Sequence, residues 1–365
     1  MRETIIDADG HVVEPEGLFR ERLAPGFRDL APRMIEEQGR IAFRSGERTS
    51  FWVRARPDSL SAPRRKGEPS GGSKAAVGAT DPAGRLADME VDSIREAVLY
   101  PTYGLMIQGV QEPEAAAALC RAVNDWLAEY CAHDPARLHG MGVIPQGDPS
   151  AALAEARRCI ENLGFCGVWR RPERIPGTPS LHDPGYDSLW SLLEEAGRPL
   201  AIHPGLNGLV PCDDIRHRFD DDYASMHAAH FPVELMLALT ELTGFGVLDR
   251  HPGLRVALLE GGATWAPPYL HRLDEHVEVF GLGRAPKLPP SEQFRRQCFV
   301  SVEEEEPGLG PMLDDYPETV MFASDYPHGD GVFPGSTQAL LTSEVLDAKQ
   351  KRRVLCDNAR RCYGL

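Results

Sequence analysis

Residues 4–11 read Thr-Ile-Ile-Asp-Ala-Asp-Gly-His, an apolar run that passes directly into carboxylate and imidazole side chains. Three further apolar runs end in the same way, in AIHPG at 201–205, LLEGG at 258–262 and FASD at 322–325. In (β/α)8 barrels the active-site residues come from the carboxyl ends of several strands. The four stretches therefore predict the fold class and the end of the barrel at which its site lies.

Short apolar runs alternate with longer stretches of helical period along most of the chain. Apolar side chains recur at helical spacing at 112–133, 150–162, 187–196, 232–248 and 266–280, and two shorter helices are expected at 345–355 and 358–363. Strands that alternate with helices pair in parallel and are buried on both faces. A tally of eight strands favours a (β/α)8 TIM barrel over an open doubly wound sheet. The predicted strands are Thr4–Ala8, Glu96–Tyr100, Leu138–Ile144, Gly167–Arg170, Pro199–His203, Leu254–Glu260, Cys298–Val302 and Thr319–Ser324.

The composition fits one domain that covers residues 1–365. A barrel needs roughly 250 residues and exceeds 400 with insertions, and 42% hydrophobic residues are enough to fill its core. The net charge of 39 − 55 = −16 argues against nucleic acid as the main partner. No stretch has the pattern of a signal peptide or a membrane span, and none of the eight cysteines forms a CxxC pair. We therefore expect a cytoplasmic protein whose cysteines are reduced.

One segment, residues 25–80, interrupts the alternation after the first predicted strand. Within it, Arg40–Phe43 and Ser50–Arg54 have the pattern of a short hairpin, and the final stretch is rich in Pro, Gly and Ser. This insertion is either a surface loop or a lid, because an insertion after a barrel strand emerges on the catalytic face. As a lid, it would bring three adjacent cations to a substrate phosphate, namely Arg64, Arg65 and Lys66.

A metal site is the simplest explanation for the polar strand ends. Carboxylates buried beside imidazoles need a partner, and a cation is an economical one. Imidazole and carboxylate ligands without thiolate suit iron, manganese or zinc, and the set is large enough for two ions. Asp7 is expected on the same face of the first strand as Asp9, because alternate residues share a face. The candidate metal ligands are Asp9, His11, His203, His230, Glu260 and Asp325.

The expected catalytic residues also come from the strand ends. Asp325 and Glu260 follow apolar runs, so each enters the barrel mouth with few polar neighbours. His328 is the third catalytic candidate, and Asp330 is expected to orient its ring in a tight turn.

A further group lies between the fifth and sixth predicted strands. His230 and Glu234 are four residues apart and share a helical face, with His227 just before them. The group either completes a second metal site or forms an exposed start of a helix.

Five motifs resemble those of the amidohydrolase-related family that includes aminocarboxymuconate-semialdehyde decarboxylase. The resemblance covers most of the chain and implies a TIM barrel with a metal site, in a protein that forms homo-oligomers. It leaves the reaction open, because members of this family differ in chemistry. The motifs are IDADGHVVEP (6–15), AIHPG (201–205), HFPVE (230–234), LLEGGATW (258–265) and FASDYPHGD (322–330).

Two departures from that family concern the metal site. Its decarboxylases have a His-x-His pair on the first strand, where this chain has Asp9 and His11, and a catalytic His after the sixth strand, where it has Glu260. The more acidic pattern resembles a branch of non-heme diiron monooxygenases, the platensimycin- and platencin-type diterpenoid hydroxylases. This resemblance implies two iron ions, dioxygen, an electron donor and hydroxylation of a bulky apolar substrate in natural product biosynthesis. If that substrate is linked to coenzyme A, the basic run at 64–66 would contact its phosphates.

Two other functions stay open beside the iron-dependent monooxygenase. A zinc or manganese hydrolase or non-oxidative decarboxylase would use the metal to lower the pKa of a bound water, with Asp325 as general base. Glu260 could then carry the proton in place of the missing His. A barrel that only binds or scaffolds would have to retain buried polar strand ends without a metal.

Overall fold

Eight parallel strands form the barrel. The computed structural model describes residues 4–50, 52, 61–67, 76–175, 177–205, 218–219, 222–281 and 286–365. This architecture confirms the predicted (β/α)8 TIM barrel, and each predicted strand has its counterpart. In their hydrogen-bonded order the strands are β1 (Ile5–Val12), β5 (Ile94–Pro101), β6 (Leu138–Val143), β7 (Gly167–Arg170), β8 (Leu200–Ile202), β9 (Val256–Leu258), β10 (Cys298–Val302) and β11 (Val320–Phe322).

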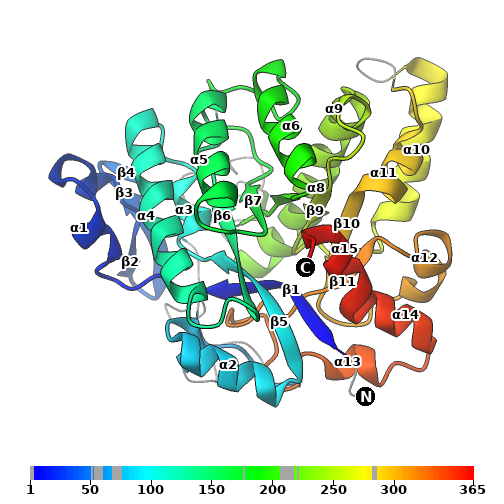
Figure 1. The fold of residues 1–365 in the computed structure, drawn as a ribbon, viewed down its shortest axis with the longest axis horizontal. Coiled ribbons are helices and arrows are strands. Elements are labelled where there is room, and N and C mark those ends of the chain that lie inside the picture. The colour runs from blue at the N-terminus through cyan, green and yellow to red at the C-terminus, as the bar shows by residue number, and fades with distance from the viewer. Residues whose placement is uncertain are drawn as a thin grey trace.

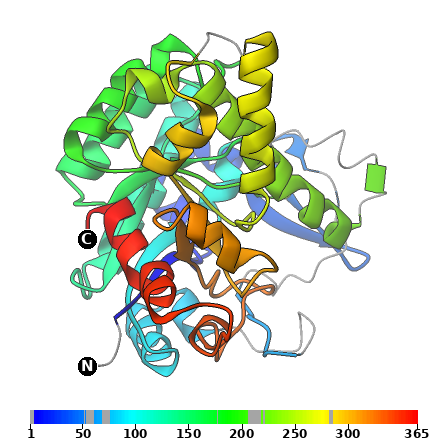
Figure 2. The ribbon, with the colours of Figure 1, turned by 90° about the vertical axis from the view of Figure 1, so that its right-hand side faces the viewer.

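Helices cover the outside of the strands (Figure 1). After a turn of 90° they surround the strands, with α10 in yellow and the C-terminal helices in red on different sides (Figure 2). The predicted helices are observed as α4 (Pro113–Cys131), α5 (Pro149–Glu161), α6 (Asp187–Ala196), α8 (Tyr223–Gly244), α9 (Val247–Arg250), α10 (Ala266–Phe280), α14 (Ala348–Arg352) and α15 (Asn358–Tyr363). Short helices that the sequence did not predict are α1 (Leu18–Arg22), α2 (Pro82–Val91), α3 (Gly104–Ile107), α11 (Pro290–Gln297), α12 (Leu309–Asp315) and α13 (Gln338–Leu341).

Strand β1 contains an irregularity that decides which of its side chains enter the barrel mouth. Its register against β5 shifts by one residue between Asp7 and Gly10. A bulge of this kind locally disturbs the alternation of side chains. Asp9 and His11 lie among the candidate metal ligands, whereas Asp7 contacts Arg85 of α2. The expectation that Asp7 and Asp9 act from one face is therefore wrong.

The segment after β1 forms a small sheet of its own. Strands β2 (Arg33–Glu37), β3 (Arg40–Ser45) and β4 (Arg48–Thr49) pair antiparallel in that order and lie at one edge of the molecule beside α1 (Figure 1). The predicted hairpin is confirmed in part: β3 turns back and pairs with β4, and the backbone N–H of Ser50 donates to the Phe43 carbonyl at 2.8 Å. Residues 51, 53 and 54 of its predicted second strand lie outside the described residues. The role of segment 25–80 as a lid stays a prediction.

The ends of β1 and β11 meet and close the barrel at its mouth. The backbone N–H of His11 donates to the Tyr326 carbonyl at 2.6 Å, and that of Asp325 donates to the Asp9 carbonyl at 3.0 Å. These two bonds place the ligand-bearing parts of β1 and of the loop after β11 side by side.

The cysteines are buried side chains of the fold. Seven of them lie within the described residues, and all seven are buried and free of disulfides. Cys212 lies outside those residues. Burial raises the pKa of thiols such as Cys298, which makes them poor nucleophiles at neutral pH. In the part of the chain that the structure describes, no helix is long and apolar enough to cross a membrane.

Candidate metal centre

Two groups of three side chains that share His11 meet at the mouth of the barrel, namely Asp9, His11 and His203, and His11, Asp325 and His328. His11 Nε2 lies 3.0 Å from His203 Nε2, 3.5 Å from Asp9 Oδ1 and 3.6 Å from Asp325 Oδ1. His203 Nε2 also lies 3.5 Å from Asp9 Oδ2. Asp9, His11, His203 and Asp325, which we call the inner four residues, are all buried. They come from β1, from the residue after β8 and from the loop after β11, so segments far apart in the sequence build one cluster.

The spacing and the chemistry of this cluster fit a divalent metal ion. Bonds of about 2.1 Å place neighbouring ligand atoms about 3.4 Å apart in tetrahedral coordination, close to the distances above. Asp9 Oδ1 is buried without a hydrogen-bond partner among the described residues. Burial raises the pKa of Asp325 well above its usual range, and the nearby carboxylates of Glu260 and Asp330 raise it further. A cation would relieve this concentration of negative charge.

The backbone holds two of the site carboxylates in unusual conformations. Asp325 has φ 49° and Glu260 has φ 58°, a region that residues other than glycine rarely adopt. Such conformations cost free energy and occur most often at functional sites. The backbone after β9 and after β11 thus adopts conformations that direct these two carboxylates into the barrel mouth.

His328 supports the cluster from one side. Its Nδ1 lies 2.8 Å from Asp325 Oδ1, its Nε2 lies 3.1 Å from Thr102 Oγ1, and its ring stacks on that of His11 at 4.1 Å. Burial lowers its pKa to about 4, so the ring is neutral at pH 7. Asp330 was expected to orient His328, but among the described residues the His328 ring contacts Asp325, Thr102 and His11 instead.

Asp330 instead belongs to a second, outer group with His227 and Glu260. His227 Nε2 lies 3.2 Å from Asp330 Oδ2 and 3.8 Å from Glu260 Oε1. Glu260 Oε2 lies 3.5 Å from His203 Nδ1, so this carboxylate bridges the outer group and the inner four residues. Burial lowers the pKa of His227, but Asp330 and Glu260 outweigh burial and raise it to about 10. The His227 side chain is 24% exposed and connects the group to solvent.

His230 lies against a buried ion pair just after β7, between Arg171 and Glu173, that the sequence analysis did not single out. Its Nε2 is 2.8 Å from Glu173 Oε1, and Arg171 Nη2 is 2.5 Å from the same oxygen. Burial raises the pKa of Glu173, but Arg171 and His230 outweigh it and lower the value to about 2. Two arginines after the apolar run of β7 were the signal that a buried anion lies nearby. Among the described residues, His230 does not lie in any cluster of side chains whose ligand atoms are close enough to share a metal ion. Its role as a metal ligand therefore stays a prediction.

The family of the chain follows from comparison with known proteins. A model of the amidohydrolase family matches residues 6–365. The chain belongs to the amidohydrolase family.

The relatives of this amidohydrolase include several decarboxylases. It is 30% identical over 269 residues to the gamma-resorcylate decarboxylase of Rhodococcus jostii, covering 67% of this chain and 76% of the relative. It is 26% identical over 294 residues to 2-amino-3-carboxymuconate-6-semialdehyde decarboxylase of Dictyostelium discoideum, covering 78% and 77%. A solved amidohydrolase from Mycobacterium avium subsp. paratuberculosis matches over the full length of both chains with TM-score 0.83 and 23% identity. A 5-carboxyvanillate decarboxylase from Novosphingobium aromaticivorans, solved with manganese, covers 100% and 97% with TM-score 0.73 and 21% identity.

The expectation of a non-heme diiron monooxygenase is wrong. The relatives that share this sequence over most of its length are decarboxylases, whose reaction requires no dioxygen and no electron donor. These relatives give no support to iron or to a coenzyme A-linked substrate. The relatives instead match the alternative that the sequence left open, a zinc or manganese hydrolase or non-oxidative decarboxylase, in its decarboxylase form.

The basic run of the amidohydrolase lies beside the outer group. Arg64 Nε donates to the Asp330 carbonyl at 2.9 Å, and its Nη2 lies 3.2 Å from Glu304 Oε1. Its backbone also bridges to the strand-like stretch at Val332. Arg64 therefore holds the loop after β11, while Arg65 and Lys66 are exposed. A phosphate contact by these residues stays a prediction.

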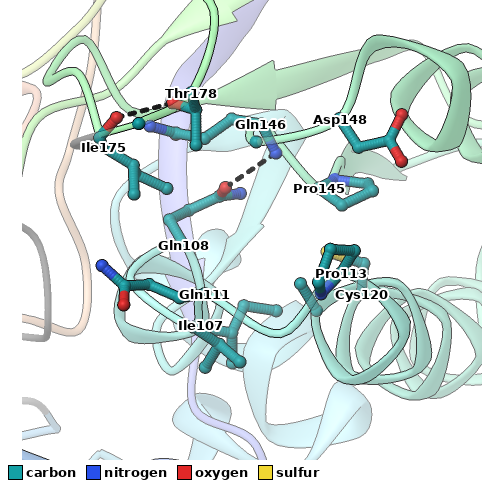
Figure 3. Close-up of a pocket in the computed structure, with 14 residues that line it drawn as sticks. Ile107, Gln108, Gln111, Pro113, Cys120, Pro145, Gln146, Asp148, Ile175 and Thr178 are labelled. Atoms are coloured by element: carbon teal, nitrogen blue, oxygen red, sulfur yellow. Dashed lines mark hydrogen bonds between the residues drawn. The ribbon is translucent and has the colours of Figure 1, made fainter.

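A cavity of about 340 Å³ lies beyond the ends of β5, β6 and β7 (Figure 3). Apolar side chains and the carboxamides of Gln108 and Gln146 line it. The Gln146 carboxamide accepts a hydrogen bond from the Arg171 backbone N–H and donates one to the Glu173 carbonyl. The cavity wall is thereby connected to the buried ion pair against which His230 lies.

Proposed function

We propose that this amidohydrolase is a divalent-metal-dependent, non-oxidative decarboxylase of a small aromatic or similarly unsaturated carboxylic acid. Asp9, His11, His203 and Asp325 would hold the ion, which we expect to be manganese or zinc. The two overlapping groups of potential ligands at the barrel mouth, which share His11, carry the proposal. The decarboxylases among the relatives support the choice of reaction.

Loss of carbon dioxide leaves a pair of electrons on carbon, which must take up a proton. A bound divalent ion would supply positive charge that orients an acidic substrate and stabilises its developing negative charge. The chain itself must therefore supply a proton donor beside the inner four residues. Carboxyl and imidazole groups with raised pKa values suit this task.

Glu260 is the proton donor that the geometry favours. Burial raises its pKa, and its side chain is only 7% exposed. His227 stands next to it, is protonated at neutral pH and has an edge toward solvent. We infer that a proton moves from solvent through His227 to Glu260 and from Glu260 to the substrate carbon. In this scheme Glu260 performs the role for which related decarboxylases use a His.

Asp330 and Glu303 tune this path. Burial and the charges of Asp330 and Glu260 raise the pKa of Glu303 to about 8, so Glu303 is mostly neutral at pH 7. Burial raises the pKa of Asp330, but His227 outweighs it and holds the pKa below its usual range. Asp330 thus stays ionised and favours the protonated form of His227, which is the form that can supply a proton to Glu260 after each turnover.

The test is carbon dioxide release under strict anaerobiosis. Metal-free protein would be loaded with Mn²⁺ or Zn²⁺ and given gamma-resorcylate, 5-carboxyvanillate and related hydroxybenzoates in D2O. We expect carbon dioxide and one deuterium on the carbon that carried the carboxylate. Glu318→Gln, an exposed position paired with Arg361, serves as the matched control and should behave as the wild type. A loaded, folded protein that releases no carbon dioxide from any of these acids would contradict the proposal.

A further inference from the structure

Arg85 on α2 is a buried cation that contacts both segments carrying the metal ligands. Its side chain is 1% exposed. Nη1 donates to the carbonyl oxygens of His11 at 3.0 Å and Tyr326 at 3.2 Å, and Nη2 donates to Asp7 Oδ2 at 3.3 Å. The guanidinium carbon lies 4.5 Å from the centre of the Tyr326 ring.

These contacts lie where β1 meets β11 and the barrel closes, which we call the seam of the barrel. Strands β1 and β11 stand at the two ends of the hydrogen-bonded strand order. Asp9 and His11 belong to one side of this seam and Asp325 to the other, so the separation of the two sides fixes the separation of the ligands. Arg85 binds one carbonyl from each side with a single nitrogen, directly behind the ligands.

Asp7 and Ser324 extend the same connection. Asp7 Oδ1 accepts from the Ser324 backbone N–H at 2.9 Å, and Oδ2 accepts from Ser324 Oγ at 2.6 Å. Ser324 immediately precedes Asp325. The Asp7 carboxylate on β1 is therefore hydrogen-bonded to the residue next to a proposed metal ligand on the β11 side of the barrel. Arg85 neutralises this buried carboxylate while holding the two carbonyls.

Stability alone does not account for this arrangement. A buried ion pair contributes little net stability compared with apolar side chains of similar volume, because both charges lose their hydration. A planar guanidinium with several fixed donors can, however, set the spacing of several acceptors at once.

We propose that Arg85 is a positioning residue for the metal centre. Arg85 sets the distance from Asp325, after β11, to the pair Asp9 and His11 on β1. This distance in turn sets the affinity for the metal ion and its coordination geometry. The proposal rests on the metal centre of the proposed function and is independent of the reaction catalysed there.

The test compares Arg85→Lys and Arg85→Met with Arg22→Met, which removes an exposed arginine paired with Glu129. Mn²⁺ affinity would be measured by competition with a chelator, and the coordination geometry by the visible absorption of bound Co²⁺. We expect both Arg85 variants to bind Mn²⁺ about 10- to 100-fold more weakly and to change the Co²⁺ spectrum, whereas Arg22→Met matches the wild type. The melting temperature of each metal-free variant reports whether it folds.

Ser324→Ala keeps the test decisive if the Arg85 variants do not fold. It removes one hydroxyl from the same connection and should also weaken Mn²⁺ binding and shift the Co²⁺ spectrum. Folded variants with wild-type affinity and an unchanged spectrum overturn the proposal. A wild type that binds no Mn²⁺, Zn²⁺ or Co²⁺ overturns the metal centre itself, together with the proposed function. Altered metal binding in a protein without decarboxylase activity supports the role of Arg85 and rejects only the reaction.

Discussion

Glu260 combines three properties that rarely occur in one residue. Its side chain is only 7% exposed, it has a positive φ of 58°, and it lies between His203 of the inner cluster and His227 of the outer group. A carboxylate held in this way would be costly if it only filled space. Glu260 lies between the inner cluster and the outer group and contacts a histidine of each. For this reason we assign the proton transfer to Glu260.

Glu260→Gln should remove the proton donor and keep the shape of the side chain. We expect kcat to fall by about 100- to 10,000-fold, the range for loss of a general acid, with little change in Mn²⁺ affinity. Steady-state carbon dioxide release and a metal titration would be measured on the same preparation. An active Glu260→Gln protein would show that another group protonates the carbon.

Glu173 offers a prediction about stability and pH. Its pKa is lowered to about 2 in the folded protein, so its pairing with Arg171 and His230 stabilises the fold above the ordinary carboxyl pKa of about 4.3. This contribution is lost as the pH falls through the folded-state value. Glu173→Gln should therefore cost about 3–5 kcal/mol at pH 7, and its difference from the wild type should shrink between about pH 4.3 and pH 2.

Urea unfolding of metal-free wild type and Glu173→Gln at several pH values measures this difference. Metal-free protein is used so that acid release of the ion does not contribute. Glu318→Gln is again the exposed control. A difference that is independent of pH would show that the ion pair is not its source.

At the scale of elements, the bulge of β1 and its contact with α2 decide how the metal ligands are presented. Gly10 lies at the bulge, directly over Arg85. A Cβ built there would lie 2.1 Å from Arg85 Nη2 and 2.7 Å from Asp7 Oδ2. Only glycine lets helix α2 approach the strand this closely.

Gly10→Ala should therefore displace Arg85 and lower the free energy of unfolding by about 1–3 kcal/mol, as expected for overpacking in a core. Gly26→Ala is the matched control, because a Cβ there meets nothing within 4 Å. Denaturant unfolding of both variants gives the comparison. Equal free energies of unfolding for the two variants would mean that α2 can move away from β1 without loss of stability.

At the scale of the whole molecule, the metal ion should be part of the stability of the barrel. The ligands come from both sides of the seam, and they crowd several carboxylates into a buried space. An ion that binds only the folded state adds about 2.7 kcal/mol when its free concentration is 100 times its Kd. We therefore expect the melting temperature to rise on addition of Mn²⁺ or Zn²⁺ to metal-free protein.

Asp9→Asn is the variant that separates specific from general effects of these ions. It should abolish most of the metal-dependent rise, whereas Glu318→Gln should preserve it. Differential scanning calorimetry with and without metal measures both. A wild-type melting temperature that does not respond to either ion would exclude a shared site across the seam.

The barrel and the polar residues at the ends of its strands could be predicted from the sequence. Eight apolar runs between helices of clear period leave few other arrangements, and His11, His203 and Asp325 follow such runs directly, so their convergence could be predicted. The different surroundings of Asp7 and Asp9, the partners of His230 and the contacts of Arg85 could be found only from the three-dimensional structure. A shift of one residue in β1 reorients side chains without altering the apolar pattern, and the contacts from Arg85 to Tyr326 and from Glu173 to His230 join segments that are distant in the chain. Strand register and helix packing determine which side chains face one another across the barrel. Short-range sequence periodicity predicts neither the register nor the packing.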